Sequence, residues 1–194
     1  MIISVKNMER TEQKVQIRSE YKKIRNSLTA GQVKEWSDII ISHLISSELF
    51  QQAEEIYFYY PLCNEVNLLP AAARALKLGK RVGFPRTEGE VIRFYQVKDL
   101  SDFKEGCFHV MEPVSVRALT AERPLILTPG LVFDDKKNRM GYGKGYYDRY
   151  FATFPEAVKV GIAYELQIAR SIPVDEYDIA MDYILTERRK ERWQ

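Results

Sequence analysis

Residues 56–85 read IYFYYPLCNEVNLLPAAARALKLGKRVGFP, and this segment decides the fold class. Its first five residues, 56–60, are aromatic or β-branched and end at a proline, which is typical of a strand buried on both faces. Residues 68–78 have helical composition and are followed by a glycine, which favours a helix end. Residues 81–84 predict a second strand that stops at Pro85. The order strand, helix, strand predicts a βαβ unit.

Further helices and strands extend this unit on both sides. Two amphipathic helices are expected before it, over residues 12–28 and from Thr29 to about residue 50, with Thr29 and Gln32 in the pattern of a capping box. After it we expect a short helix through Tyr150 and strands at residues 91–97, 125–127, 158–163 and 183–186, whereas residues 99–123 are the least regular stretch and their elements are not placed by the sequence. The alternation predicts an α/β fold, a three-layer α/β/α sandwich with a mostly parallel sheet and the N-terminal helices packed on it.

Composition and charge limit the classes of function. The 194 residues are 45% hydrophobic, enough for one core, so residues 1–194 are expected to form a single domain. Lys plus Arg number 29 and Asp plus Glu 27, a balance that argues against nucleic-acid and membrane partners. Without a signal segment or an apolar run of about 20 residues, we expect a cytoplasmic protein, and we take it to be a monomer. Cys63 and Cys107 have no metal or redox spacing and are interpreted as structural thiols.

The segment most suggestive of chemistry is residues 139–148, RMGYGKGYYD. Three alternate glycines let backbone N–H groups approach an anion closely, and Lys144 and Arg139 supply positive charge beside a helix start. The pattern departs from a P-loop, since Gly145 follows the lysine, and from the dinucleotide-binding fingerprint, since Tyr146 takes the place of its third glycine. A glycine-rich turn can be mere geometry, but the flanking charges favour a phosphate cradle.

Other charged residues are weaker candidates. Lys14, Arg18 and Arg25 lie within roughly 40° of one another on the first helix, so they could reach into a cleft, although covering a core edge is at least as good an explanation. Glu65 follows the first predicted strand, where open α/β sheets bind ligands, but it could instead cap the next helix.

Three aspartates could supply the oxygen ligands that Mg²⁺ prefers: Asp148, Asp178 and Asp182. Taken singly, each is more simply a helix cap or a surface charge. His43 and His109 have no partner pattern and are interpreted as structural.

Together these residues resemble the 5-formyltetrahydrofolate cyclo-ligase family. The resemblance rests on residues 129–134, PGLVFD, running into residues 138–149, NRMGYGKGYYDR, with weaker support from Lys14, Arg18, Glu65, Pro85-Arg86, Glu112-Pro113, Pro173, Asp178 and Thr186-Glu187. It implies ATP binding by Lys14, Arg18, Arg139, Met140, Gly141, Tyr142, Gly143, Lys144, Gly145, Tyr146 and Tyr147, with Lys144 and Arg139 acting in catalysis. It also implies folate binding by Tyr60 and Glu65, and Mg²⁺ binding by Asp148 and Asp178, with Asp182 ranked lower. Val66-Asn67 departs from the usual family pattern beside the folate pocket.

The implied reaction converts 5-formyltetrahydrofolate and ATP to 5,10-methenyltetrahydrofolate, ADP and phosphate. Phosphorylating the formyl oxygen would make it a leaving group that N10 of the folate displaces, so no enzyme nucleophile is needed. Two alternatives remain at this point: an ATP-dependent kinase of another small metabolite, and an RNA-binding module that uses Lys136, Lys137, Arg139, Lys144 and Arg149 with Tyr142, Tyr146 and Tyr147.

Overall fold

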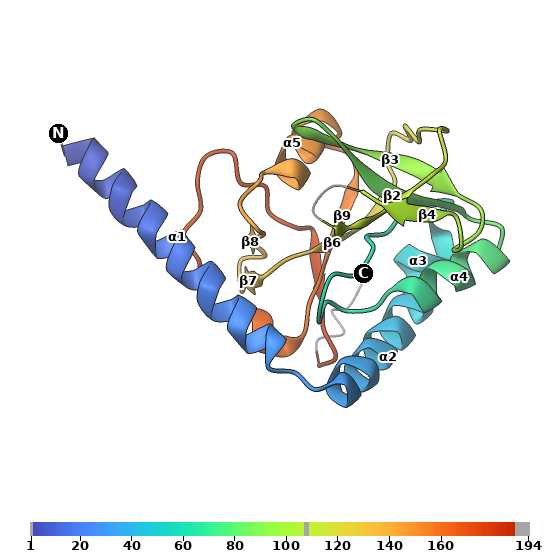
Figure 1. Cartoon of the computed structure of the whole chain (residues 1–194), viewed down its shortest axis with the longest axis horizontal. Coiled ribbons are helices and arrows are strands. Elements are labelled where there is room, and N and C mark those ends of the chain that lie inside the picture. Colours follow the sequence, from blue (N-terminus) through green and yellow to red (C-terminus); the bar gives the residue numbers. More distant parts are fainter. Residues whose placement is uncertain (1, 107–108, 189–194) are drawn as a thin grey trace.

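A six-stranded, mostly parallel sheet forms the centre of the structure (Figure 1). The computed structural model describes residues 2–106 and 109–188, with side chains from residue 10 onward. Its strand order is β11-β9-β6-β1-β2-β3, and only β3 runs antiparallel to its neighbour. The strands are β1 (Glu55–Tyr57), β2 (Arg81–Glu88), β3 (Val91–Val97), β6 (Leu125–Pro129), β9 (Val158–Ile162) and β11 (Tyr183–Leu185). The expectation of a mostly parallel α/β sheet is confirmed.

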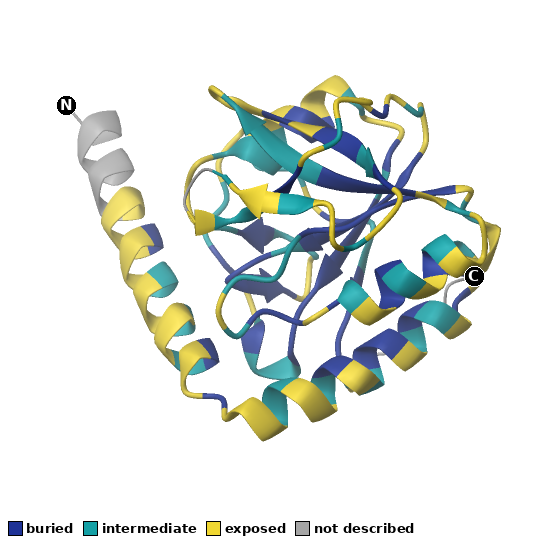
Figure 2. Cartoon of the chain, turned by 45° about the vertical axis from the view of Figure 1, so that its right-hand side comes forward, coloured by how far each residue is buried: buried dark blue, intermediate teal, exposed yellow. Residues whose placement is uncertain are grey.

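Three helices cover one face of this sheet: α2 (Ala30–Ser46), α3 (Glu48–Gln52) and α4 (Leu69–Lys77). Their apolar sides, including Leu44 and Ala72, share one buried cluster with Ile56 and Leu127 of the strands. Figure 2 shows these helices buried toward the sheet and exposed on their outer sides. This pattern is the one that a 3.6-residue period produces when a helix lies on an apolar surface.

The opposite face is covered partly by a helix and partly by a second, small sheet. Helix α5 (Tyr146–Thr153) lies beside three short strands, β7 (Val132–Asp134), β8 (Arg139–Met140) and β10 (Ile168–Ala169). Tyr57 and Ile126 of the central sheet pack here against Phe133 and Phe151. Because adjacent strand residues point to opposite faces, Ile56 and Tyr57 reach different cores. The three-layer arrangement is therefore present, with one outer layer only partly helical.

Helix α1 (Ile2–Asn26) differs from the expected arrangement. Its first half extends beyond the body of the molecule (Figure 1), and its residues Ile17 and Tyr21 pack against Val132 and Met140 of the small sheet. The expectation that the N-terminal helices pack on the central sheet thus holds for α2 and is wrong for α1. In this position Lys14 and Arg25 are buried, and each faces carboxylates: Asp175 and Asp178 for Lys14, and Glu65 for Arg25. No described helix is long and apolar enough to cross a membrane.

The predicted stop at Pro85 is wrong, because β2 continues through it to Glu88. Pro85 pairs with Phe94, whose carbonyl accepts from the amide of Leu119 and so points away from β2. The pairing of β2 with β1 has already ended at Gly83. Neither neighbouring strand therefore needs the N–H group that proline lacks.

Smaller differences concern element ends. Strand β1 ends at Tyr57, so residues 58–60 leave the sheet earlier than expected. The Thr29 capping box is present, but the helix it starts ends at Ser46, and Ser47 becomes extended and caps the separate helix α3. Residues 99–123, for which no element was predicted, contain a hairpin of β4 (Phe103–Glu105) and β5 (Met111–Pro113).

Candidate functional site

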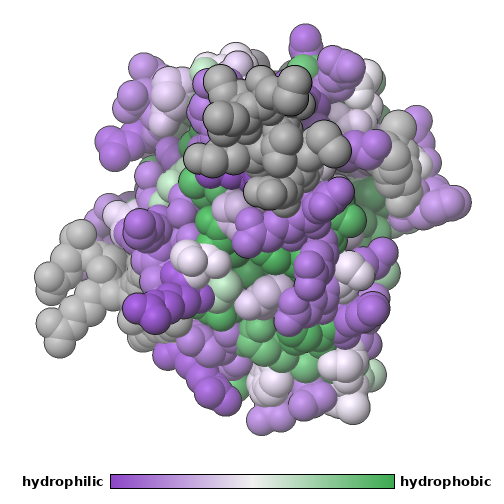
Figure 3. All heavy atoms as spheres, turned by 90° about the vertical axis from the view of Figure 1, so that its left-hand side faces the viewer, coloured by the Kyte–Doolittle hydropathy of each residue, from purple (hydrophilic) through white to green (hydrophobic). Residues whose placement is uncertain are grey.

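A pocket of about 670 Å³ opens where several parallel strands end, next to α1. Its walls include Tyr59 and Tyr60 after β1, and Pro129 at the end of β6, which is where open α/β sheets bind ligands. Of the site residues nominated from the sequence, all but Asp182 line it: Lys14, Arg18, Tyr60, Glu65, residues 139–147, Asp148 and Asp178. The face of the molecule that carries α1 shows apolar residues near its centre among hydrophilic ones (Figure 3). The structure thus brings together side chains from both ends of the chain.

The glycine-rich loop has the backbone of an anion cradle. Gly143 has φ +89° and Gly145 has φ +65°, conformations that favour glycine. Gly145 is also the N-cap of α5 and offers no side-chain cap, so the first N–H groups of that helix remain available to a ligand. Nε of Arg18 donates to the carbonyl of Gly141 at 3.1 Å, and a Cβ on Gly143 would lie 3.2 Å from the guanidinium carbon of Arg18. Loop and helix α1 are therefore in close contact.

Two cations of this pocket are paired with carboxylates. Nη2 of Arg139 lies 2.9 Å from Oδ2 of Asp148, and the arginine is buried. Nζ of Lys14, also buried, lies 2.6 Å from Oδ2 of both Asp175 and Asp178. Two residues expected to bind ATP, Arg139 and Lys14, therefore pair with the two aspartates expected to hold Mg²⁺. Lys14 also pairs with Asp175.

The two candidate metal ligands lie near each other in the fold. Oδ1 of Asp148 accepts from the amide of Ile179 at 3.3 Å, next to Asp178 in the chain. Within residues 2–106 and 109–188, no hydrogen bond is formed by Oδ1 of Asp178, and no group of three or more His, Cys, Asp or Glu side chains could hold a metal. Two carboxylates fit Mg²⁺, which takes one or two protein carboxylates and completes its octahedron with water and phosphate oxygens.

Glu65 is buried next to Tyr142 of the glycine-rich loop, called the phosphate loop below. Its Oε1 accepts from Nη1 of Arg25 at 3.1 Å and from the hydroxyl of Tyr142 at 3.4 Å, and its Oε2 accepts from the amide of Leu62 at 3.0 Å. Burial raises the pKa of the Glu65 carboxyl, while Arg25 opposes this shift. Helix α4 begins at Leu69, and its N-cap Leu68 makes no side-chain cap, so the interpretation of Glu65 as a helix cap is wrong.

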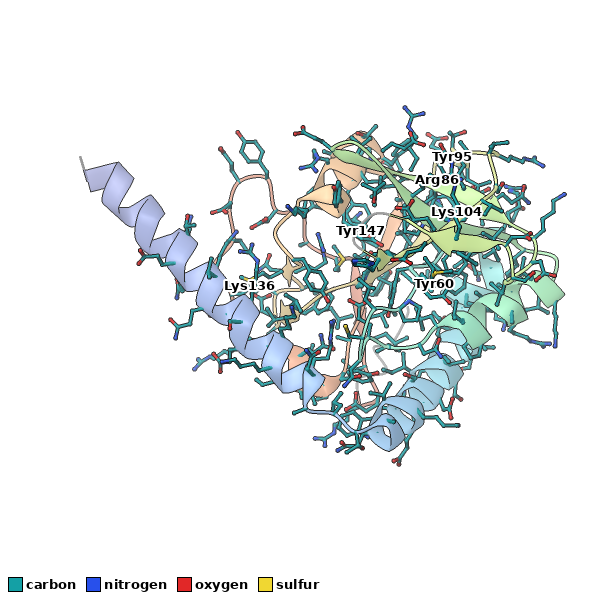
Figure 4. All side chains as sticks on the ribbon, viewed as in Figure 1. Tyr60, Arg86, Tyr95, Lys104, Lys136 and Tyr147 are labelled. Atoms are coloured by element: carbon teal, nitrogen blue, oxygen red, sulfur yellow. The ribbon has the colours of Figure 1, made fainter. Side chains whose placement is uncertain are left out.

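Aromatic residues form the less polar part of the pocket. Tyr60 packs edge-on against Phe103 at 5.1 Å between ring centroids, and the ring of Tyr147 lies 5.3 Å from the guanidinium carbon of Arg139. Burial raises the pKa of Tyr147 far above its usual range, so its hydroxyl stays protonated. In Figure 4, Tyr60 and Tyr147 lie toward the centre of the molecule, whereas Lys136 lies apart from them and does not line the pocket.

Sequence reasoning missed several wall residues. Asp175 shares Lys14 with Asp178, and the carboxylate of Glu112 accepts from the amide of Thr87 at 3.0 Å. Arg25 had been grouped with Lys14 and Arg18 by helical spacing but was not nominated for the site. Two signals were available: Asp175 precedes Asp178 by three residues, and Glu112 is part of a pair that supports the resemblance.

Other residues lie where the sequence did not place them. Asp182 pairs with Lys159 at 3.0 Å and is outside the pocket wall, in keeping with its lower rank. Cys63 is exposed at the pocket, so its interpretation as a structural thiol is wrong, and Cys107 lies outside the described residues. His109 is exposed at the pocket edge beside Glu105, whereas His43 is half-buried against the carbonyl of Thr186, as a structural role requires.

Three of the five cations of the RNA-binding alternative are engaged in contacts within the fold. Arg139 is buried, Lys137 donates to the carbonyl of Asp182 at 2.8 Å, and Arg149 donates to the carbonyls of Glu90 and Lys144. Nucleic-acid binding of this kind requires charges and rings presented together to a strand. The structure does not favour it.

Comparisons with known proteins agree with the geometry. Residues 10–187 match the model of the 5-formyltetrahydrofolate cyclo-ligase family. The chain is similar to a 5,10-methenyltetrahydrofolate synthetase structure from Aquifex aeolicus, with 33% identity, a TM-score of 0.81 and coverage of 91% of this chain and 90% of that one. A Mycoplasma pneumoniae synthetase shares the fold, with 23% identity, a TM-score of 0.73 and coverage of 90% and 98%. A 5-formyltetrahydrofolate cyclo-ligase from Mycoplasma genitalium is 43% identical over 134 residues, 68% of this chain and 72% of the relative.

Proposed function

The chain belongs to the 5-formyltetrahydrofolate cyclo-ligase family, and we infer from this that it is an ATP-dependent ligase that converts 5-formyltetrahydrofolate to 5,10-methenyltetrahydrofolate. The observation that carries this function is the single pocket of about 670 Å³ that holds both the phosphate cradle and Glu65. A pocket of this size is within the range of ligand sites. It offers the cations and N–H groups that a nucleotide requires, and the carboxylate and aromatic ring that suit a reduced folate.

The chemistry follows from the poor reactivity of the substrate. An N-formyl group is an amide, whose carbonyl carbon is weakly electrophilic and whose oxygen is a poor leaving group. Transfer of the γ-phosphoryl group of ATP to the formyl oxygen releases ADP and makes both atoms reactive. N10 of the folate then forms a bond to the formyl carbon and loses its proton, and the carbon–oxygen bond breaks to release phosphate. Positioning of N10 replaces an enzyme nucleophile.

The phosphate end of the pocket is assigned to Lys14, Arg18 and residues 139–147. The N–H groups of the glycine-rich loop and of the start of α5 bind phosphate oxygens, while Lys144 and Arg139 stabilise the charge that develops during transfer. Arg139 is already held by Asp148, so its guanidinium group keeps one orientation. Charge-assisted hydrogen bonds from a fixed arginine favour in-line transfer.

The folate end is assigned to Tyr60 and Glu65. The reduced pterin is planar and rich in N–H donors, so an aromatic ring can pack against it and a buried carboxylate can accept its hydrogen bonds. Glu65 accepts from Arg25, Tyr142 and Leu62, which fixes both of its oxygens. A buried acid matched to such donors gives strong discrimination against ligands that lack them.

We also assign one Mg²⁺ ion to Asp148 and Asp178. When bound with ATP, this ion would neutralise phosphate charge and draw the nucleotide into the cradle. Each carboxylate uses its Oδ2 for a cation, Asp148 for Arg139 and Asp178 for Lys14, so Oδ1 of each would reach the ion while both pairs stay in place. The same four side chains therefore balance charge with and without the ion.

The remaining assignments follow from the proposed reaction. Its need for ATP supports a cytoplasmic location, and a site built from both ends of the chain supports a single domain that works as a monomer. Light scattering during gel filtration measures the oligomeric state directly.

One assay tests the proposed function. Purified protein is mixed with 5-formyltetrahydrofolate and Mg-ATP, and the near-ultraviolet absorbance of the methenyl product is followed. We expect a rise that requires both ATP and folate and that stops on chelation of Mg²⁺. A protein that hydrolyses ATP with another metabolite but forms no methenyl product would instead be a kinase of the alternative class.

A further inference from the structure

Arg25, near the C-terminal end of α1, connects the two ends of the pocket without lining it. Its Nη1 lies 3.1 Å from Oε1 of Glu65, and its Nη2 lies 2.6 Å from the hydroxyl of Tyr142. Glu65 and Tyr142 are themselves 3.4 Å apart. Each arm of one guanidinium group therefore holds a residue assigned to a different substrate.

The burial of Arg25 needs an explanation beyond packing. Only 1% of this residue is exposed, and among the described residues its Nε has no hydrogen-bond partner. A buried ion pair is weak evidence for stability, because desolvation offsets much of its attraction and apolar residues of similar volume often serve as well. What a planar guanidinium group adds is direction, since its N–H groups point along fixed lines.

We propose that Arg25 is a positioning residue. It fixes the carboxylate of Glu65 against the hydroxyl of Tyr142, so that Glu65, which is assigned to the folate, and the phosphate loop keep one relative position. The assignment rests on the proposed function, since it takes Glu65 as a folate ligand. Arg25 acts through Glu65 and Tyr142 and touches neither substrate itself.

The charges around Glu65 support this role. Of the described groups that face its carboxylate, Arg25 is the cation, and the others are the phenols of Tyr59, Tyr142, Tyr147 and Tyr164. Burial raises the pKa of each of these tyrosines, so they stay neutral. Loss of Arg25 would raise the pKa of Glu65 further. As pH falls, the carboxylate of Glu65 would then become protonated, and lose its charge, at a higher pH than in the wild type.

Two substitutions and a matched control test the proposal. Arg25→Met removes the cation, and Arg25→Lys keeps the charge but loses the fork that reaches two partners. Lys23→Met removes an exposed cation from the same last turn of α1. Each protein is assayed for methenyl formation with 5-formyltetrahydrofolate and ATP varied separately, across pH, and its thermal midpoint is measured alongside.

We expect Arg25→Met to raise KM for the folate at least about tenfold and KM for ATP less than about threefold. We also expect the acid limb of kcat/KM for the folate to move to higher pH. Arg25→Lys should restore the position of the acid limb but only part of the folate affinity, and Lys23→Met should match the wild type. If Arg25→Met does not fold, the folate KM of Arg25→Lys decides: a raised value supports the proposal, and an unchanged value contradicts it.

Three results would overturn the proposal. One is an unchanged folate KM and pH profile in the Arg25 variants, whatever happens to the thermal midpoint. Another is an equal rise in both KM values, which would indicate general loosening. Wild-type protein that forms no methenyl product would overturn the proposed function and this assignment with it, whereas active wild type with unaffected variants overturns the assignment alone.

Discussion

Nζ of Lys14 lies 2.6 Å from Oδ2 of Asp178, and the two residues are 164 positions apart in the chain. This contact joins a cation assigned to ATP with a carboxylate assigned to Mg²⁺. It also joins α1 to the loop around residues 173–178, together with the Lys14–Asp175 pair and the hydrogen bond from Arg18 to Gly141.

Asp178→Asn should shift half-maximal activity to a higher Mg²⁺ concentration, because an amide keeps the shape of the side chain but not its charge. Asp175→Asn is the matched control, since Asp175 also pairs with Lys14 at 2.6 Å but is not assigned to the metal. A Mg²⁺ titration of both variants checks this. Equal shifts in the two would mean that Asp178 serves only to hold Lys14.

Lys144→Gln should lower turnover by at least about a hundredfold and change the free energy of unfolding by less than about 0.5 kcal/mol. Lys144 is exposed on the glycine-rich loop. Its charge is therefore expected to stabilise the negative charge that develops on the transferred phosphate, and to contribute little to folding. Lys136→Gln, an exposed lysine outside the pocket, is the control and should keep full turnover. Steady-state rates and denaturant unfolding measure the two effects, and equal turnover in both variants contradicts the role of Lys144.

Gly143→Ala should weaken ATP binding, because the added Cβ meets the guanidinium carbon of Arg18 at 3.2 Å. Gly79→Ala has similar backbone strain, at φ +75°, but its Cβ meets nothing within 4 Å. Both should lose about 1 kcal/mol of stability from the left-handed conformation. Only the first should raise the dissociation constant of an ATP analogue in calorimetry, and a similar rise in both would remove the steric argument.

Glu65→Gln should raise the folate KM or cut turnover while the ATP KM stays within about twofold, since the amide replaces an acceptor oxygen with a donor beside Arg25 or Leu62. Kinetics with each substrate varied separately measure this. A change in thermal midpoint alone would remove Glu65 from the folate site.

The stability contributed by Glu65 should fall as pH rises. Its pKa is raised in the folded protein, mainly by burial, so the folded state binds its proton more tightly than the unfolded state does. The contribution is therefore fully present below the unfolded pKa of about 4.3 and is lost as pH passes the folded value. The difference in unfolding free energy between wild type and Glu65→Gln should shrink as pH rises above about 4, and a growing difference would contradict the sign.

Local patterns predicted those parts of the fold that depend on neighbours in sequence. The Thr29 capping box and the glycine cradle appear where spacing placed them, because caps and tight turns are decided within a few residues. The prediction that the strand stops at Pro85 was wrong because a strand tolerates proline where the neighbouring strands need no N–H group. Whether they need one at Pro85 depends on where β1 ends, which the local sequence does not show.

The sequence named many of the residues that line the pocket but not the pairs that they form. The resemblance nominated Lys14, Asp148 and Asp178 separately, and only the folded chain shows which cation meets which carboxylate. Arg25 has the helical spacing of its neighbours, but nothing in that spacing shows that it turns inward to a residue 40 positions away. Contacts between distant segments are decided by the packing of α1 on the small sheet, which has no local signal.

The position of α1 also has a consequence for protein synthesis. Lys14 is translated 161 residues before Asp175 and 164 before Asp178, so a growing chain carries Lys14 without these two counter-ions over that whole stretch of synthesis. The central strands can pair before then, but closing a loop of this length comes late and slowly. Nascent chains that end before residue 175 should therefore contain helices and strands but lack a finished phosphate site, and nucleotide can assist folding only after translation has passed that point.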